Sequence, residues 1–484
     1  MNTLRTLLLA LAAAGCMAAT PVYSADLWDV YQLALNNDPT FAQAQANYEA
    51  ALEDKPIARA GYLPALTLNA SKSRSTTYGT QFGVVGTDPT TGQPILGNTY
   101  ASVPGRDTQY GLKLTQPLFN WAAWENIKQA DASVAQAQAQ FIAAQQDLIV
   151  RTATAYFNVI TARDTLAADH AATAANEKQL DQTKAKYQVG MSAVTDVQNA
   201  QAAYDQSVAN EIGAQQQVIN AEESLRAITG EAVVELQEPP TDMPLRKPDP
   251  ANTQQWVDTA LKQNPNLMAA QAAADVASST ISIKRAGHYP TLDLSASYGR
   301  DNATGTVFNT YDYRQKQIML QFSMPLFSGG GVSAQVTQAQ RQYDAAQDQV
   351  QLVTRQTIQQ TRTSYLGVLT GISQVEALHQ SVKSNATSLQ AMETGMQVGT
   401  RTIVDVLLAR QNLVTAQTNF SQSRDNYLTS VLQLKQAAGI LSAQDVKQIN
   451  ALLLVPTPMP VMDTQAPPSA ADTSETPPPE SNNN

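Results

Sequence analysis

The sequence predicts an exported α+β membrane protein, built by internal tandem duplication, in which β-hairpins that cross a membrane are continued by very long helices. Three observations support this prediction. The 484-residue chain begins with an apolar export segment, its two halves repeat the same order of motifs, and the stretch from Trp121 to Val189 contains neither Gly nor Pro.

The composition favours helices that pack closely through small side chains. The hydrophobic fraction is 43%, but much of it is Ala, and Gln, Asn, Ser and Thr are abundant. Such a chain is expected to form an elongated or hollow object with broad polar surfaces instead of one thick core. The net charge of -10 disfavours nucleic acid as a partner, because phosphate binding needs clustered Lys and Arg.

The N-terminus has the features of an export signal. Arg5 precedes the apolar run "TLLLALAAAGCMAA", and small residues follow it. We predict a signal peptide over residues 1–25, with Asp26 as the first residue of the mature chain. The single cysteine, Cys16, lies within this segment. Its context "AAGC" leaves lipidation at Cys16 as an alternative processing route.

Paired phrases divide the mature chain into two repeats. "LALNNDPTFAQAQA" (33–46) resembles "ALKQNPNLMAAQAA" (260–273), and "GYLPALTLNAS" (61–71) resembles "GHYPTLDLSAS" (287–297). We therefore assign residues 26–238 to the first repeat and 251–454 to the second, joined by a Pro-rich linker over 239–250. The Pro-, Ser- and Thr-rich residues 455–484 are predicted to be a disordered tail.

Each repeat contains one predicted β-hairpin, at about 62–120 and about 288–328. Leu66, Leu68 and Ala70 alternate with polar neighbours, and the same pattern recurs from Leu292. Each strand is expected to span about 9 to 11 residues, which suits a tilted membrane strand; an ordinary soluble hairpin is the alternative. An insert of about 18 residues near "TQFGVVGTDPTTGQPILGNTY" in the first copy is predicted to be a surface loop.

After each hairpin the sequence predicts two long helices, over about 121–229 and about 332–438. The phrases "VGMSAVTDVQ" (189–198) and "VGTRTIVDVL" (398–407) interrupt them at equivalent points. Gly190 and Gly399 can adopt the left-handed conformation that ends a helix. The repeated phrase therefore predicts the tips of two helical hairpins.

Four strands are too few to close a membrane barrel, because the smallest barrels use about eight and lipid does not tolerate an open sheet edge. Several chains must therefore share one barrel. Three chains would supply twelve strands and twelve long helical segments, and the helices would continue the barrel as a tube.

The order and spacing of several motifs resemble the TolC family of outer-membrane channels of Gram-negative bacteria. The motifs are "TATAYFNVITA", "VGMSAVTDVQNAQAAYD", "LRAITG", "HYPTLDLSAS" and "VGTRTIVDVL", and the match extends over essentially all of residues 26–455. The resemblance implies a homotrimer with a twelve-stranded outer-membrane barrel, a periplasmic α-helical barrel and a mixed α/β equatorial belt. It also implies passive conduction of drugs, toxic small molecules or type I secretion substrates, delivered by an inner-membrane efflux pump or ABC exporter through a periplasmic adaptor protein.

The same resemblance implies a gate at the periplasmic end. Arg401 would link to Thr195 and Asp196, and Asp405 would form an acidic ring in the throat. This chain departs from the family at Leu408, where a second acidic residue is expected, and at Met396, where a Tyr is expected. The helix tips at Val189, Gly190, Val398 and Gly399 would dock the adaptor, and the barrel would contact outer-membrane lipid.

Catalytic, cofactor and metal motifs find little support in the sequence. His170, His288 and His379 are isolated along the chain, and "SGGG" (328–331) lacks the Lys of a phosphate loop, so we interpret it as a turn between strand and helix. We therefore predict no enzyme activity, no cofactor and no metal. The competing function is a barrel-anchored trimeric coiled-coil adhesin or structural spacer, but strand hairpins inside both repeats favour the channel.

Overall fold

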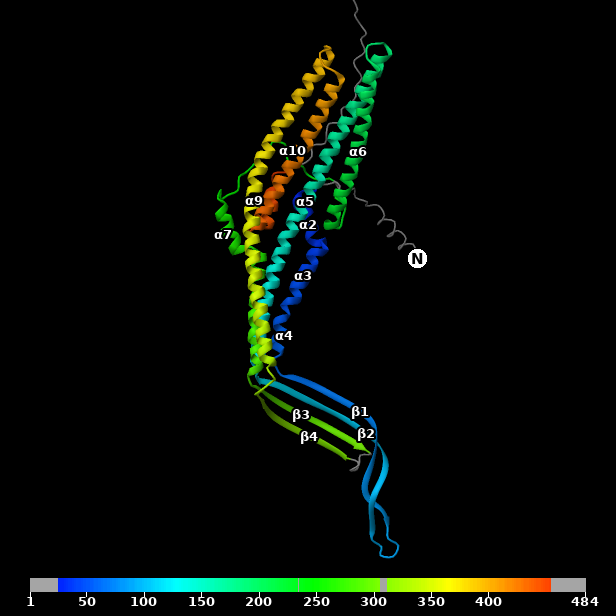
Figure 1. The fold of residues 1–484 in the computed structure, drawn as a ribbon, viewed down its shortest axis with the longest axis vertical. Helices are drawn as coiled ribbons and strands as arrows, with labels where there is room; N and C mark the ends of the chain where they lie inside the picture. The colour runs from blue at the N-terminus through cyan, green and yellow to red at the C-terminus, as the bar shows by residue number, and fades with distance from the viewer. Residues whose placement is uncertain (1–24, 234, 305–310, 454–484) are drawn as a thin grey trace, which may run out of the picture.

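The chain folds into a long helical body with a β-sheet at one end (Figure 1). The computed structural model describes residues 25–233, 235–304 and 311–453. The predicted signal peptide, apart from Ala25, and the predicted tail lie outside these residues, and so does Cys16. None of the helices in the described ranges combines the length and apolar character needed to cross a membrane.

Two long helices from each repeat form the helical body. In the first repeat α5 spans Trp121–Gln188 and α6 spans Val194–Thr229. In the second, α9 spans Gly331–Gln397 and α10 spans Ile403–Ala437. At 1.5 Å per residue the 68 residues of α5 extend roughly 100 Å. The uninterrupted Ala- and Gln-rich run therefore does form a single helix.

Shorter helices cover the parts of α5 and α9 that α6 and α10 do not reach. α3 (Pro39–Leu52) and α4 (Asp54–Ala60) lie along α5, and α8 (Pro265–Arg285) packs against both α5 and α9. α3 and α8 begin alike, with Pro at the first helical position and an Asp38 or Asn264 side chain capping the first turn. The repeated phrases at 33–46 and 260–273 thus encode equivalent helix starts.

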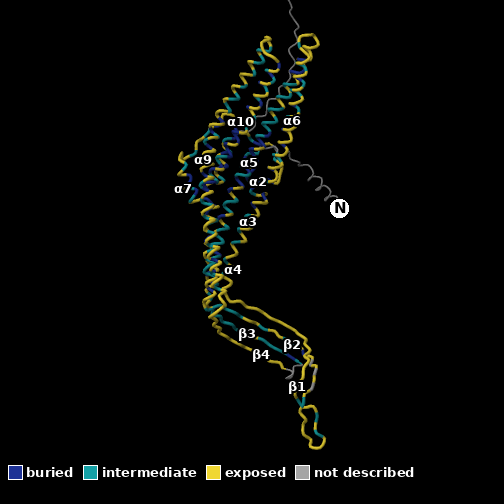
Figure 2. The backbone as a smooth tube through the Cα atoms, in the orientation of Figure 1, coloured by how far each residue is buried: buried dark blue, intermediate teal, exposed yellow. Residues whose placement is uncertain are grey.

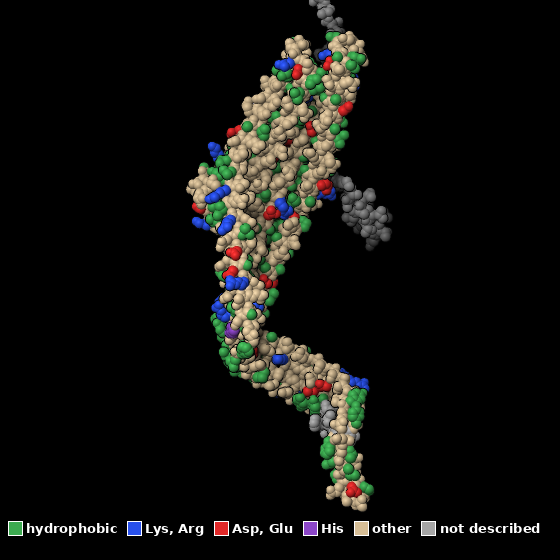
Figure 3. Space-filling view, viewed as in Figure 1, with side chains coloured by type: hydrophobic (Ala, Val, Ile, Leu, Met, Phe, Trp, Pro, Cys, Tyr) green, Lys and Arg blue, Asp and Glu red, His purple; other side chains and the backbone are tan. Residues whose placement is uncertain are grey.

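The long helices approach one another through small side chains. The buried alanines of α5, α6 and α9 are Ala123, Ala130, Ala139, Ala153, Ala155, Ala162, Ala200, Ala214 and Ala339. Figure 3 shows few charged side chains on the visible face of the helical body, in line with a charged fraction of 15%. Close approach of Ala-rich faces stabilises the body with little apolar volume.

The core is concentrated midway along the helical body, where Figure 2 shows most of the buried residues. Three short helices cover the long ones here, namely α2 (Leu27–Asn37), α7 (Thr253–Gln263) and α11 (Ala443–Asn450). Large, fully buried side chains of this belt include five from α5 and α10: Tyr156, Phe157, Ile160, Leu428 and Leu432. Each such side chain contributes about 1.5–3 kcal/mol on burial, so this belt is the main hydrophobic cluster of the described residues.

The segment between the repeats crosses this belt and is held by side chains of the long helices. The Tyr427 hydroxyl accepts a hydrogen bond from the Arg246 N–H at 2.8 Å and donates one to the Arg246 carbonyl at 2.9 Å. The Tyr156 hydroxyl donates to the Gln237 carbonyl at 2.7 Å. These bonds fix an extended segment that makes few backbone pairs of its own.

Four strands form a single antiparallel sheet in the order β1-β2-β3-β4. They are β1 (Ala65–Thr87), β2 (Pro94–Phe119), β3 (Thr291–Thr304) and β4 (Tyr311–Ser323). A short helix, η1 (Ala286–His288), precedes β3. The turn predicted at "SGGG" is confirmed, because Gly329 and Gly330 adopt φ of 62° and 80° just before α9. The two hairpins of the duplication therefore lie side by side in one sheet.

Two predictions about the strands are wrong. The strands span 23, 26, 14 and 13 residues, longer than the 9 to 11 that the local alternation predicts. The predicted surface loop is a continuation of β1 and β2, paired from Gly79↔Ala101 to Thr87↔Pro94. Its alternating Tyr, Thr, Phe and Val residues favour pairing, so the insert lengthens the hairpin into a ribbon that projects beyond the sheet (Figure 1).

We expect Gly439→Ala to destabilise the protein more than Gly190→Ala. Both glycines adopt positive φ, 77° and 76°, which costs a side chain roughly 1–2 kcal/mol. At Gly439 a Cβ would also lie 2.3 Å from the Gln263 carbonyl oxygen, whereas at Gly190 it would meet nothing within 4 Å. Backbone overlap adds about 1–3 kcal/mol. Thermal melting of the purified variants checks this, and equal losses at both positions would contradict the close approach of α10 to α7.

Candidate functional site

The two helical hairpins end at the same extremity of the molecule, away from the sheet (Figure 1). At one tip the Gly190 N–H donates to the Tyr187 carbonyl at 2.9 Å and the Met191 N–H to the Lys186 carbonyl at 2.8 Å. At the other, the Thr400 N–H donates to the Gly395 carbonyl at 2.8 Å. Gly190 and Gly399 both have φ of 76°, as the repeated phrase predicts.

The two repeated Asp residues cap the helices that begin after the tips. Asp405 Oδ2 accepts hydrogen bonds from the Thr402 N–H and hydroxyl, both at 2.9 Å. Asp196 Oδ2 accepts from the Ala193 N–H at 3.2 Å and from the Ser192 hydroxyl at 2.9 Å. Sequence reasoning missed this shared role, although Thr402 and Asp405 have the spacing of a capping box; at the other tip the N-cap residue is Ala193.

Capping also sets the charge state of Asp405. The hydrogen bonds from the Thr402 N–H and hydroxyl lower the pKa of the Asp405 carboxyl, and the positive charge of Arg401 lowers it further. The carboxylate therefore remains ionised under mildly acidic conditions.

Within one chain, no hydrogen bond or ion pair in the described ranges joins Arg401 to Thr195 or Asp196. The Arg401 side chain instead lies over its own hairpin, where a Cβ added to Gly395 would be 2.6 Å from Arg401 Cγ. A link from Arg401 to Thr195 or Asp196 therefore requires a neighbouring chain or a different side-chain conformation.

A different polar link, which the sequence did not reveal, joins the hairpins. Arg410 on α10 donates to Glu393 on α9 at 2.9 Å and to Asn176 on α5 at 3.1 Å. Its side chain is only 13% exposed. The guanidinium bridges both hairpins because its fork of donors reaches two acceptors at once.

An apolar cluster beside this link also joins the hairpins. Leu180 of α5, Ala200 of α6 and Ile403 of α10 are buried together, with Met396 and Leu407 packed against them. Met396 thus occupies an intramolecular contact near the tips. The two hairpins of one chain are in contact here, so they are expected to move together unless this cluster opens.

Other predicted site residues project from the tips. Leu408 lies about one turn beyond Asp405 and is 61% exposed, and Val404 before it is 49% exposed. Val189 and Val398 are each 69% exposed. These apolar side chains are not buried within the single chain. Exposed apolar groups of this kind are typical of surfaces that contact another protein.

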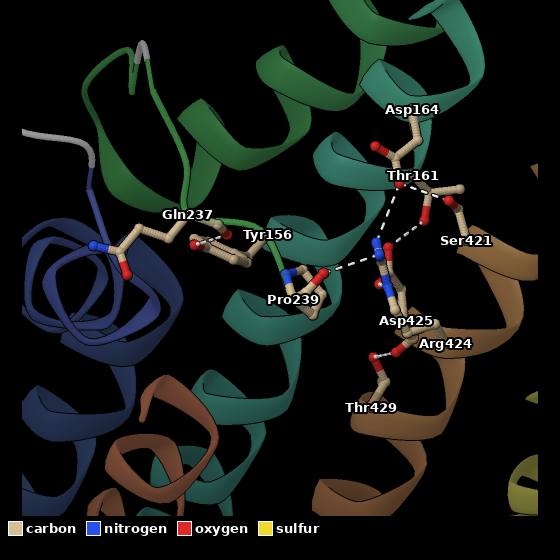
Figure 4. A network of polar contacts seen from close by, with 9 residues as sticks. All are labelled: Tyr156, Thr161, Asp164, Gln237, Pro239, Ser421, Arg424, Asp425 and Thr429. Carbon is tan, nitrogen blue, oxygen red and sulfur yellow. Dashed lines mark hydrogen bonds and ion pairs between the residues drawn. The ribbon is translucent and has the colours of Figure 1, made fainter. Parts of the chain in front are cut away.

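A buried charged network clamps α10 to α5 and to the segment between the repeats (Figure 4). Arg424 donates to Asp164 at 3.1 Å, to Asp425 at 3.0 Å and to the Pro239 carbonyl at 3.0 Å. The Thr161 hydroxyl donates to Asp425 at 2.8 Å. Every arm of the guanidinium is thus used, as a buried cation requires.

Burial raises the pKa of Asp425 to about 6, despite the opposing effect of Arg424. Burial also raises the pKa of Glu238, assisted by the charge of Asp164. Both carboxyls lie near the guanidinium of Arg424. Its single positive charge is shared among several acidic groups, so it does not offset the effect of burial on either pKa.

Two of the three histidines, which have no partner at helical spacing in the sequence, each lie near a single carboxylate from a distant segment. His170 Nδ1 lies 2.7 Å from Glu211 Oε1, and His379 Nε2 lies 3.8 Å from Asp242 Oδ1. The partners are far apart in sequence, which is why spacing did not reveal them. Over the part of the chain that the structure describes, no three His, Cys, Asp or Glu side chains form a metal-binding group.

The chain is similar in sequence to known outer membrane proteins. A sequence model of the family described as "Outer membrane efflux protein" matches residues 30–231 and 256–440. The chain is 36% identical to outer membrane protein TolC of Escherichia coli over 446 residues, covering 89% of this chain and 85% of that protein. It is 28% identical to the alkaline protease secretion protein AprF of Pseudomonas aeruginosa over 433 residues, covering 89% and 87%.

A solved channel structure has the same fold. The Campylobacter jejuni CmeC outer membrane channel superposes with a TM-score of 0.71 at 20% identity, covering 88% of this chain and 89% of that one. The arrangement of sheet, belt and helical hairpins described above is therefore shared with a known outer membrane channel.

We expect the stability of the wild type, relative to Asp425→Asn, to fall as pH rises. A carboxyl whose folded pKa is raised stabilises the fold below its unfolded pKa of 3.8, and this contribution is lost as pH rises through the folded value of about 6. The melting temperature of Asp425→Asn minus that of the wild type should therefore increase between pH 3.8 and about pH 6, and level off at higher pH.

Asp405→Asn is the matched control for this experiment. The pKa of Asp405 is lowered by its hydrogen bonds, so its contribution should be lost as pH falls, which is the opposite direction. A melting difference for Asp425→Asn that stays constant from about pH 4 to about pH 7 would contradict the burial of an ionisable Asp425.

Proposed function

The chain belongs to the outer membrane efflux protein family, and we propose that it is an outer-membrane exit duct for drugs, toxic small molecules and secreted proteins. The observation that carries this proposal is a sheet with two open edges that continues directly into helices roughly 100 Å long. The name of AprF, a protease secretion protein, supports protein export as one of its uses. The chain is a transport protein, and we propose that it has no catalytic activity.

Three chains are proposed to form the duct. Strands β1 and β4 each have one unpaired edge within the chain, and lipid requires every backbone group to be hydrogen-bonded. Neighbouring strands within the chain are antiparallel, so β1 and β4 run in opposite directions. β4 of one chain can therefore form an antiparallel pair with β1 of the next chain. Three copies then close a twelve-stranded barrel, and the helices continue it into the periplasm as a tube.

The duct is proposed to receive its cargo from an inner-membrane efflux pump or ABC exporter through a periplasmic adaptor. The exposed apolar tips around Val189, Gly190, Val398 and Gly399 are the proposed adaptor surface. They lie at the far end of the helices from the sheet, and Val189 and Val398 are largely exposed in the single chain. Substrate then passes without energy input from this protein.

The gate is proposed to lie at the same tips. Three Asp405 carboxylates around a threefold axis would repel one another and attract cations. The lowered pKa of Asp405 supports a ring that is charged at neutral pH. Arg401 is proposed to reach Thr195 and Asp196 of the neighbouring chain, while Leu408 narrows the throat without adding charge and Met396 packs within its own chain.

We expect Arg401→Ser and Asp405→Ala to raise the conductance of purified trimers in planar bilayers. The first removes a closing link, and the second removes the carboxylates that hold cations in the throat. A charge-assisted hydrogen bond of about 1.5 kcal/mol lost from the closed state would raise the open fraction roughly tenfold. If trimers give no pore, even with either change, the proposed function is wrong.

Asp405→Asn separates the charge of the ring from helix capping, because the amide oxygen can still accept hydrogen bonds from Thr402. Its cation selectivity should fall as in Asp405→Ala, with less loss of thermal stability. An exposed carboxylate on α6, Asp205, which lies about three turns from the start of the helix, provides the control. Asp205→Asn should leave conductance and selectivity unchanged.

We expect Gly395→Ala to open the gate without altering any charged group. A Cβ at this position would lie 2.6 Å from Arg401 Cγ and 3.3 Å from its Cβ, so the Arg401 side chain must move. Conductance should rise in the same direction as for Arg401→Ser. Gly367→Ala, where a Cβ would meet nothing within 4 Å, should conduct like the wild type. Wild-type conductance from Gly395→Ala would contradict the proposed placement of Arg401.

A further inference from the structure

The register of the sheet divides its side chains between two faces. Residues directly opposite each other on paired strands project to the same face. Leu66 pairs with Leu114, Leu114 with Ala296, and Ala296 with Ile318. The next row toward the hairpin ends is Leu68, Leu112, Tyr298 and Lys316. This face is therefore apolar on the half of the sheet that adjoins the helices.

The opposite face is polar. Its side chains include Thr67, Asn69, Ser71, Lys113, Gln109, Asp107, Ser295, Ser297, Asp301, Gln315 and Gln317. Its charged side chains include one cation, Lys113, and the carboxylates of Asp107, Asp293 and Asp301, in separate rows. If the sheet is part of a membrane barrel, as the proposed function has it, the apolar face must contact lipid and the polar face must line the water-filled lumen.

Beyond the apolar rows, the lipid-facing side becomes basic. The row that pairs Tyr110 with Arg300 continues to Arg314, and the last row of the sheet pairs Arg74 directly with Arg106. Lys72 and Lys316 have the same strand parity and lie on this face as well. The six cations are Lys72, Arg74, Arg106, Arg300, Arg314 and Lys316, and they come from all four strands. Figure 3 shows Lys and Arg side chains over the end of the sheet away from the helices.

These cations are poorly neutralised by the chain itself. In the described rows of this face from Leu66 to Arg74, the one carboxylate is Asp312, which bonds Arg300 through the Arg300 Nε–H at 2.7 Å. Arg74 and Arg106 are directly opposite and both exposed, and like charges in that position destabilise a sheet. An anion that lies against them from outside would remove this cost.

Tyrosines mark the boundary between the apolar and basic rows. The Arg300 guanidinium donates to the Tyr110 hydroxyl at 3.3 Å, and Lys316 Nζ lies 5.8 Å from the centre of the Tyr298 ring. Tyrosines are enriched where acyl chains meet headgroups. The basic rows are thus at headgroup depth, on the side of the membrane opposite the helices.

We propose that these six cations form a belt that binds the phosphate groups of lipids in the outer leaflet of the outer membrane. The inference rests on the proposed function, because it requires the sheet to span a membrane. Arg and Lys at headgroup depth attract anionic lipid, with about 1 kcal/mol for each cation, and Arg binds phosphate oxygens in pairs. In the trimer the belt would encircle the barrel with eighteen such side chains, six from each chain.

Full-length trimers in phosphatidylcholine vesicles provide the test, with two forms of one lipid as probes. Wild-type protein should bind bisphosphorylated lipid A more tightly than the same lipid stripped of one phosphate. The triple variant Lys72→Gln, Arg74→Gln, Arg106→Gln should lose this preference, with affinity falling about fivefold for each cation removed from a bound lipid. Lys113→Gln, which changes a cation on the polar face, should bind like the wild type.

Single-channel conductance of the same trimers separates this inference from the proposed function. If the triple variant conducts like the wild type but has lost its lipid preference, the belt is supported. If it retains the wild-type preference for bisphosphorylated lipid, or if Lys113→Gln loses the preference equally, the belt is overturned whatever the conductance. A wild type that binds the lipid but never conducts would leave the belt intact and refute the duct.

Discussion

The hydrogen bonds that β1 and β4 leave unmade are the constraint on which the rest of the architecture depends. Each strand has one free edge in the isolated chain, and a free edge cannot persist in hydrocarbon, where an unpaired backbone group costs several kcal/mol. One face of the sheet is apolar and must contact lipid, so the edges have to be satisfied by other copies of the chain. Association is therefore a requirement of the fold in a membrane.

The helical body is held together differently along its length. In the middle, large side chains such as Tyr156 and Leu432 and the Arg424 network fix the long helices to the belt. Toward the tips the two hairpins are joined by a small apolar cluster and by the Arg410 link. A body that is tightly packed at its middle and loosely packed at its tips can open at the tips while the middle stays fixed. This gradient suits a gate at the end of the tube.

Features that depend on neighbouring residues were predictable from the sequence. Gly190 and Gly399 end helices because a left-handed residue is needed there, and the absence of Gly and Pro allowed α5 to continue unbroken. Features that depend on distant residues were not. Arg424 and Asp164 are 260 positions apart, and the length of the first hairpin depends on pairing between two strands that each look ordinary. The basic belt became visible only once the register was known, because its members come from four strands.

Cross-linking between neighbouring chains tests the central claim, that chains join through β1 and β4, most directly. The only cysteine, Cys16, lies in the predicted signal segment, so introduced cysteines can be read without background. Asn69→Cys on β1 would be combined with a cysteine at Gln315, Gln317 or Met319 on the same face of β4. We expect covalent species of up to three chains, and none larger, from at least one combination. No interchain product at any position, or closed assemblies of two or four chains, would contradict it.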